Sequence, residues 1–197
     1  KKIQIVQLPK GTEWYKINDN QKGVYRTKYS KEQLAQLKSL ITQNKLSTFN
    51  RWGIQNDIFN LALINEIPLS EYFDFIKSYY NESNAFVLED IYSNISKINR
   101  IFFDEKFWQN IWPKYKNYIK NPFTKAIKRL SWTPNKKESH NNSLLRPLAI
   151  SYLGFAEYNE IIRGGFDKFQ QFLKDASSLH PDIKGPVLSI VGRNGNK

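Results

Sequence analysis

NRWGIQNDIFNLALINEIPLS, residues 50–70, decides the fold, because polar residues dominate its first half and apolar residues its second. On a helix the apolar side chains at positions 54, 58, 61 and 62 share one face, so the stretch predicts a helix from about residue 47 to residue 66 that ends before Pro68. Asn50 or Thr48 can cap its start, while Gln55 and Asp57 lie around the cylinder from the apolar face. We expect Asp57 to bond a backbone group or an arginine of an adjacent helix rather than to act in catalysis.

The helical pattern continues on both sides of this stretch. Before it, Ser30 and Gln33 have the spacing of a capping box ahead of a leucine-rich face. After it, a helix is predicted from Ser70, followed by helices at about 84–103, 104–120, 122–131, 140–154 and 157–176 and a short element after Pro181. Helical hairpins of about 35 to 45 residues joined by short loops predict a mainly α fold, a HEAT- or armadillo-like α-α superhelix.

The first thirty residues read as a few β-strands that precede the helices. Residues 3–8 (IQIVQL) and 24–29 (VYRTKY) have strand character, and residues 13–19 (EWYKIND) alternate less cleanly. Turn residues at 9–11 and 18–23 separate these segments. Three strands are marginally stable alone, so we expect them to join a neighbouring sheet or to pack on the helices after residue 30.

Composition restricts the chemistry that this chain can perform. It has 197 residues, no cysteine and two histidines, His140 and His180, which are too far apart for a helical pair of zinc ligands. No run of about 18 apolar residues predicts a membrane span. The absence of cysteine slightly favours a cytoplasmic location, and the absence of methionine, even at position 1, suggests a piece of a longer protein.

Basic residues are concentrated between Lys97 and Lys137. This segment contains eleven Lys and Arg but two acidic residues, and aromatic residues are interleaved among them. The formal net charge of the whole chain is +12. That pattern allows single-stranded nucleic-acid binding by stacking beside the charges. However, residues 108, 111, 112, 115 and 119 follow one helical stripe, which favours a core face backed by a solvated basic face.

Four segments together resemble one family. These are GVYRTKYS (23–30), LSTFNRWGIQNDIFNLA (46–62), LSWTPNKKESHNNSLLRPLAISYLG (130–154) and HPDIKGPVLSIVGRNG (180–195). In this order and at these separations they resemble the aminopeptidase N type of zinc metallopeptidases and its helical C-terminal domain, the endoplasmic-reticulum-aminopeptidase C-terminal-like domain. Asn50 stands where that family usually has Asp.

The resemblance implies a map of the chain. In that family a β domain, a thermolysin-like zinc domain and a β-sandwich precede a helical superhelix that caps the active site. Residues 1–30 would be the last strands of the sandwich, and residues 31–197 the first part of the cap. The zinc ligands and catalytic groups of the family belong to upstream regions, so no catalytic or metal residue is assigned here, and zinc is implied for the parent protein alone.

The resemblance also implies partners and candidate contacts. The partners would be a peptide substrate and the upstream catalytic domain, with no membrane and no nucleic acid expected. Arg146 and Arg193 are candidates for a basic cap wall that attracts a peptide carboxylate, and Asn50, Arg51 and Asp57 are expected to make a helix cap and inter-helix polar contacts. The chain alone should be inactive. The alternative is a stand-alone HEAT-like scaffold that binds nucleic acid or acidic proteins.

Overall fold

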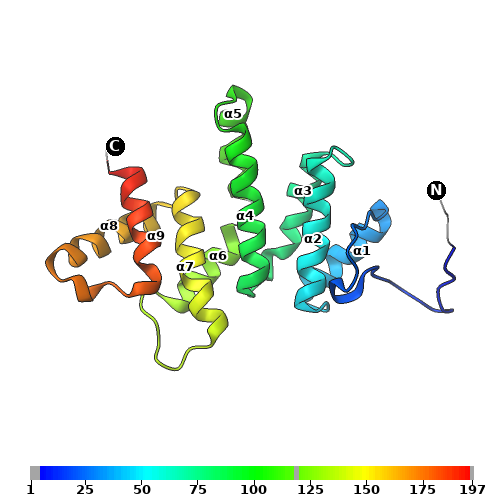
Figure 1. The fold of residues 1–197 in the computed structure, drawn as a ribbon, viewed down its shortest axis with the longest axis horizontal. Helices are drawn as coiled ribbons and strands as arrows, with labels where there is room; N and C mark the ends of the chain where they lie inside the picture. Colours follow the sequence, from blue (N-terminus) through cyan, green and yellow to red (C-terminus); the bar gives the residue numbers. More distant parts are fainter. Residues whose placement is uncertain (1–4, 118–119, 196–197) are drawn as a thin grey trace.

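The computed structural model describes residues 5–117 and 120–195, and the regular structure within these ranges is helical (Figure 1). The mainly α prediction is therefore confirmed. The helices are η1 (Asp19–Gln21), α1 (Lys31–Thr42), α2 (Thr48–Leu63), α3 (Leu69–Ile76), η2 (Lys77–Asn81), α4 (Ala85–Phe102), α5 (Lys106–Tyr115), α6 (Lys120–Leu130), α7 (His140–Phe155), α8 (Asn159–Lys174), η3 (Ala176–Ser178) and α9 (Pro181–Asn194). No helix of the described ranges is both long enough and apolar enough to cross a bilayer.

The helices form hairpins that stack along the long axis of the molecule. In Figure 1, α2, α4, α7 and α9 stand side by side, and α2 packs on α4, α4 on α7 and α7 on α9. The hairpin partners α3, α6 and α8 pack against α2, α7 and α9, respectively. The HEAT- or armadillo-like superhelix predicted from the sequence stays a prediction.

A continuous apolar core runs through this stack. In α4 the buried residues recur every three or four positions, so one stripe of the helix faces the core. Aromatic rings fill the space between hairpins: the ring centroids of Phe73 and Tyr115 are 4.2 Å apart, and those of Phe123 and Tyr152 are 4.3 Å apart. The core therefore links every hairpin from α1 to α9.

The strands predicted before residue 30 are not found among residues 5–30; the prediction for residues 3 and 4 lies outside the described part. Residues 24–29 run over α2 without a ladder partner, with a bend at 23–25, and the backbone N–H of Thr27 donates to Asp57 at 3.2 Å. A strand needs a neighbouring strand to satisfy its backbone groups, and the described chain offers none. The side chain of Val24 is fully exposed.

Helix starts follow the local sequence closely. Ser30 caps α1, and the predicted capping box is present: Ser30 Oγ accepts from Gln33 N, and the Gln33 side chain accepts from Ser30 N. The cap of α2 differs from the prediction of Asn50 or Thr48. Ser47 is the cap, because its Oγ accepts from the backbone N–H of Asn50.

Three helix ends close with the same backbone turn. After α1, α2 and α7 the residues Asn44, Asn65 and Glu157 have positive φ values of 54°, 59° and 56°. In each turn two successive N–H groups donate back to carbonyls of the last helical turn, as Lys45 N does to Leu40 O at 2.9 Å. The turn reverses the chain within a few residues and so sets the hairpin geometry.

Candidate functional site

The polar residues of the opening stretch lie in the interior. Asn50, Arg51, Gln55 and Asp57 are between 0% and 7% exposed, whereas the sequence placed Gln55 and Asp57 away from the buried face. α2 is covered on several sides at once, by η1, α3 and α4. These residues therefore need hydrogen-bond partners from each neighbour.

Arg51 joins two hairpins through a buried ion pair. Its Nε and Nη2 donate to the two carboxylate oxygens of Glu82 at 2.6 and 3.1 Å, and its Nη1 donates to Leu46 O at 2.6 Å. Glu82 precedes α4 and also accepts from the backbone N–H groups of Ser83 and Asn84. The bidentate geometry fixes the start of α4 against α2.

Asn50 and Asp57 hold the segment that precedes α1. Asn50 Oδ1 accepts from the backbone N–H of Asn20 at 2.7 Å, and its Nδ2 donates to Asp19 at 2.7 Å. Asp57 accepts from Thr27 N and pairs with Arg26 at 3.2 Å. Burial raises the pKa of Asp57 above its ordinary value, against the opposing effects of Arg26 and the Thr27 N–H.

Sequence reasoning missed the partners of Gln55. Its Oε1 accepts from Tyr72 OH at 3.3 Å and from Asn94 Nδ2 at 3.1 Å, and its Nε2 donates to Asp90. The network ties α2 to α3 and α4. Its members lie up to 39 positions apart in the chain, so no local sequence pattern predicts the network.

Arg146 is also buried, at 1% exposure. Its Nη1 donates to Glu138 Oε1 at 2.7 Å and its Nη2 to the other oxygen, while Nε and Nη2 also donate to the carbonyls of Ser131 and Leu130. The side-chain donors thus hold the 131–139 loop on α7. This arrangement favours a structural role over the peptide contact expected from the sequence.

Arg193 lies in a different setting, in a groove open to solvent. Three adjoining hollows of about 320, 220 and 580 Å³ share Phe155 and Arg193 in their walls. Arg193 is exposed, and its guanidinium carbon lies 5.6 Å from the centre of the Phe155 ring. The lining residues come from α4, α5, α7 and α9 and from the turns after α4 and α7. We call it the Arg193 groove.

The Arg193 groove carries more positive than negative charge. Lys97 and Arg100 on α4 are exposed and, within the described residues, make no ion pair. Of the two acidic residues in its walls, Glu157 is bound by Lys116 Nζ at 2.6 Å, which leaves Asp104. Polar residues recur at positions 93, 96, 97 and 100, a helical spacing that indicates one polar face of α4. Nothing in the sequence predicted that this face and α9 line the same groove.

The region from Lys97 to Lys137 is mainly a core face with charges on its outside. Trp108 is 2% exposed, and Ile111, Trp112 and Tyr115 pack against the core, while position 119 lies outside the described residues. These buried rings are not available for stacking with bases, whereas Phe103 and Phe107 of the same region are 64% and 52% exposed. Several cations also have protein partners: Lys125 Nζ lies 3.7 Å from the Tyr80 ring centre, and Arg129 donates to Asn142. The nucleic-acid alternative stays a prediction.

A metal centre would need several ligands close together. In the ranges 5–117 and 120–195, no group of three or more His, Cys, Asp and Glu side chains comes together.

Comparisons with known proteins place this geometry in context. A family model described as "ERAP1-like C-terminal domain" matches residues 14–197. Aminopeptidase M1-B of Oryza sativa subsp. japonica is 32% identical over 181 residues, which cover 90% of this chain and 20% of that protein. Aminopeptidase M1 of Arabidopsis thaliana is 28% identical over 186 residues (93% and 21%), and Aminopeptidase 2 of Candida albicans is 25% identical over 197 residues (98% and 21%). The chain spans about a fifth of the length of these relatives.

Proposed function

We propose that this chain, which belongs to the ERAP1-like C-terminal domain family, is part of the helical cap of a zinc aminopeptidase and helps to bind its peptide substrate. The relatives named above are aminopeptidases, so the chain is a fragment of a hydrolase of that kind. Zinc and the catalytic groups would belong to the rest of the parent protein. The chain alone would hydrolyse nothing.

The proposed domain division follows from the same relationship. Residues 1–30 would pair with strands of a β-sandwich that precedes the cap, and residues 31–197 would form the first part of the cap. The exposed side chain of Val24 supports this division, because a neighbouring sheet would bury it.

The observation that carries the substrate-binding proposal is the Arg193 groove. Its walls hold three exposed cations and, among the described residues, one acidic side chain without an ion pair, so the groove attracts a carboxylate. Its aromatic wall at Phe155 offers apolar contact to the adjacent side chain. We assign the C-terminal carboxylate of a peptide to this groove. Arg193 would contact it directly, with Lys97 and Arg100 contributing attraction from α4.

The test uses the complete aminopeptidase that contains this chain. KM is measured for one peptide in two forms, with a free C-terminal carboxylate and with a C-terminal amide. Arg193→Ala should raise KM for the free acid about two- to fivefold, the size of an exposed ion pair, and leave KM for the amide unchanged. Arg193→Lys should retain much of the preference because it keeps the charge.

Arg163→Ala is the matched control, since Arg163 is exposed on α8 and lies outside the walls of the groove. It should leave both KM values unchanged. Equal effects of Arg193→Ala on the acid and the amide would contradict carboxylate recognition by Arg193.

A further inference from the structure

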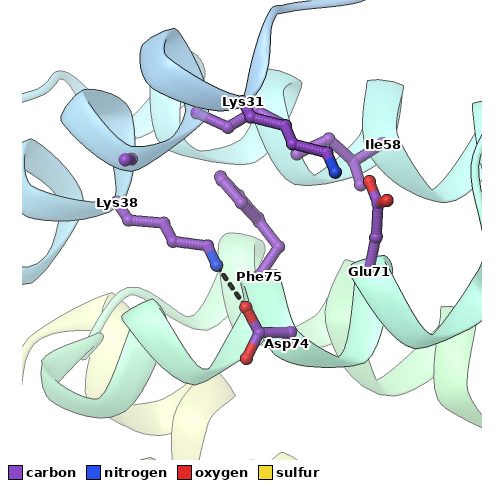
Figure 2. Close-up of a pocket in the computed structure, with 8 residues that line it drawn as sticks. Lys31, Lys38, Ile58, Glu71, Asp74 and Phe75 are labelled. Carbon is purple, nitrogen blue, oxygen red and sulfur yellow. Dashed lines mark hydrogen bonds and ion pairs between the residues drawn. The ribbon is translucent and has the colours of Figure 1, made fainter.

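A second hollow lies at the other end of the molecule, between α1, α2 and α3. Its volume is about 280 Å³ (Figure 2). It shares no lining residue with the Arg193 groove. Its walls are Lys31, Leu34, Ala35 and Lys38 from α1, Ile58 from α2, and Glu71, Asp74 and Phe75 from α3. We call it the α1–α3 pocket.

The floor of the α1–α3 pocket is apolar. Leu34, Ile58 and Phe75 come from three different helices, and Ile58 and Phe75 are core residues, 3% and 1% exposed. In Figure 2 the Phe75 ring lies between the two lysine side chains. An apolar side chain that entered here would be removed from water on several sides, which is favourable.

The rim of the pocket bears opposite charges on opposite sides. Both lysines are on α1, and both acidic residues are on α3. Lys38 already pairs with Asp74, which closes one end of the mouth. At the other end, Lys31 and Glu71 extend toward each other from the two helices (Figure 2), and neither makes an ion pair within the described residues.

We propose that the α1–α3 pocket binds a free apolar α-amino acid. The carboxylate would face Lys31, the ammonium group would face Glu71, and the side chain would lie over Leu34, Ile58 and Phe75. A cation and an anion that form no ion pair in the described part of the chain, held above an apolar floor, are complementary to the three parts of such a ligand. This inference is independent of the peptidase proposal and of the Arg193 groove.

The size of the pocket supports a ligand as small as one amino acid. Pockets for drug-sized ligands start at about 300 Å³, so 280 Å³ lies just below that range. A longer peptide would extend past the Lys38–Asp74 pair at one end of the mouth. The rim is exposed to solvent, so affinity should be modest, with a dissociation constant on the order of 1 mM.

The experiment is a titration of the ¹⁵N-labelled 197-residue chain with four ligands, followed by NMR. Leucine carries both charges and the apolar side chain, leucinamide lacks the carboxylate, N-acetylleucine lacks the ammonium group, and glycine lacks the side chain. Leucine should shift backbone signals of α1 and α3. Each of the other three ligands should bind at least about threefold more weakly.

Variants of Lys31 and Glu71 test which charged group of the ligand each residue contacts. Lys31→Gln should remove the advantage of leucine over leucinamide, and Glu71→Gln should remove its advantage over N-acetylleucine. Lys31→Glu combined with Glu71→Lys keeps one charge of each sign and should retain selectivity for the zwitterion. Lys45→Gln, an exposed change outside the pocket, should alter nothing. The helical circular dichroism of each variant confirms that it is folded.

Three results would overturn the proposal. They are an absence of leucine-induced shifts at tens of millimolar, equal binding of leucine and both blocked forms, and shifts that map to α4, α7 or α9 instead of α1 and α3.

Discussion

α2 and α7 are both 16-residue helices of the same row, yet their buried faces differ in chemistry. α2 buries Asn50, Arg51, Gln55 and Asp57, whereas the buried residues of α7 are apolar or aromatic apart from Gly154 and Arg146. The number of neighbouring segments does not explain the contrast, because α7 also contacts several helices.

The difference lies in the kind of chain that each helix packs against. A neighbouring helix has already satisfied its own backbone groups, so an apolar surface suffices against it. Irregular chain brings free N–H and C=O groups, and side chains must pair with them. Asn50 and Asp57 do this for residues 19–27, and Arg146 does it for the 131–139 loop. Asn50, Asp57 and Arg146 therefore mark where loops or the segment before α1 contact the stack. Gln55 differs, because its partners are side chains of α3 and α4.

The largest expected effect is on the Arg51–Glu82 pair. Arg51→Ala would leave the Glu82 carboxylate, whose side chain is 3% exposed, without its cation, so the free energy of unfolding should fall by about 3–5 kcal/mol. Urea unfolding followed by circular dichroism measures the loss. Arg51→Met combined with Glu82→Gln should recover part of it.

The matching change in α7, Arg146→Ala, should lower the free energy of unfolding by less than Arg51→Ala does. Glu138 is 11% exposed and lies in a loop, so after Arg146→Ala it can turn toward water. Equal losses for Arg51→Ala and Arg146→Ala would show that the difference in burial between the two glutamates has no energetic consequence.

A smaller effect is expected where α7 packs on α9. A Cβ at Gly154 would lie 2.7 Å from Ile190 Cγ1, so Gly154→Ala should cost about 1–3 kcal/mol through overpacking. Gly192 is the control, because a Cβ there meets no atom within 4 Å; Gly192→Ala should be neutral or should stabilise the helix by up to about 1 kcal/mol. Thermal unfolding of the two variants compares them directly, and similar melting temperatures would argue against close packing at Gly154.

The smallest effect is a difference in pH response. The hydrogen bond from Arg146 lowers the pKa of Glu138 below its ordinary value. A lowered folded-state pKa means that the pair stabilises the fold above the unfolded-state pKa and that this contribution is lost as pH falls through the folded-state pKa. The stability difference between the unmodified chain and Glu138→Gln should therefore be constant near neutral pH and shrink in acid.

Asp57 should respond with the opposite sign, because burial raises its pKa. Its folded form takes up a proton more readily than its unfolded form, so its contribution becomes more favourable as pH falls through the raised folded-state pKa. Carboxyl NMR titration of Asp57 and Glu138 gives both directions in one experiment. Shifts of the same sign would contradict the contrast between the two regions.

Periodicity and capping predicted most of the helical framework, since both are local properties of the sequence. The capping box at Ser30 and the buried stripe of α4 needed only residues three or four positions apart. The strands before residue 30 could not be judged this way, because a strand depends on a partner elsewhere. The prediction that Gln55 lies away from the core was wrong for a similar reason. Residues distant in sequence cover the side of α2 that its own pattern leaves polar.

The candidate sites were predicted less well than the fold. Arg146 and Arg193 are the same residue type, and only their surroundings distinguish a buried pair with Glu138 from an exposed position beside Phe155. The Arg193 groove combines residues from α4, α5, α7 and α9, and the α1–α3 pocket combines three helices. Grooves of this kind follow from how hairpins stack, which no single segment encodes.

The closing turns after α1, α2 and α7 bear on how far such a sequence can diverge. Their hydrogen bonds run between backbone atoms, so they require one residue that accepts a left-handed conformation and leave the neighbouring side chains largely free. Asn44, Asn65 and Glu157 show that this residue need not be glycine. Hairpin geometry can thus be inherited while the surrounding residues drift, which suits a chain that aligns over nearly its whole length with proteins only 25% to 32% identical to it.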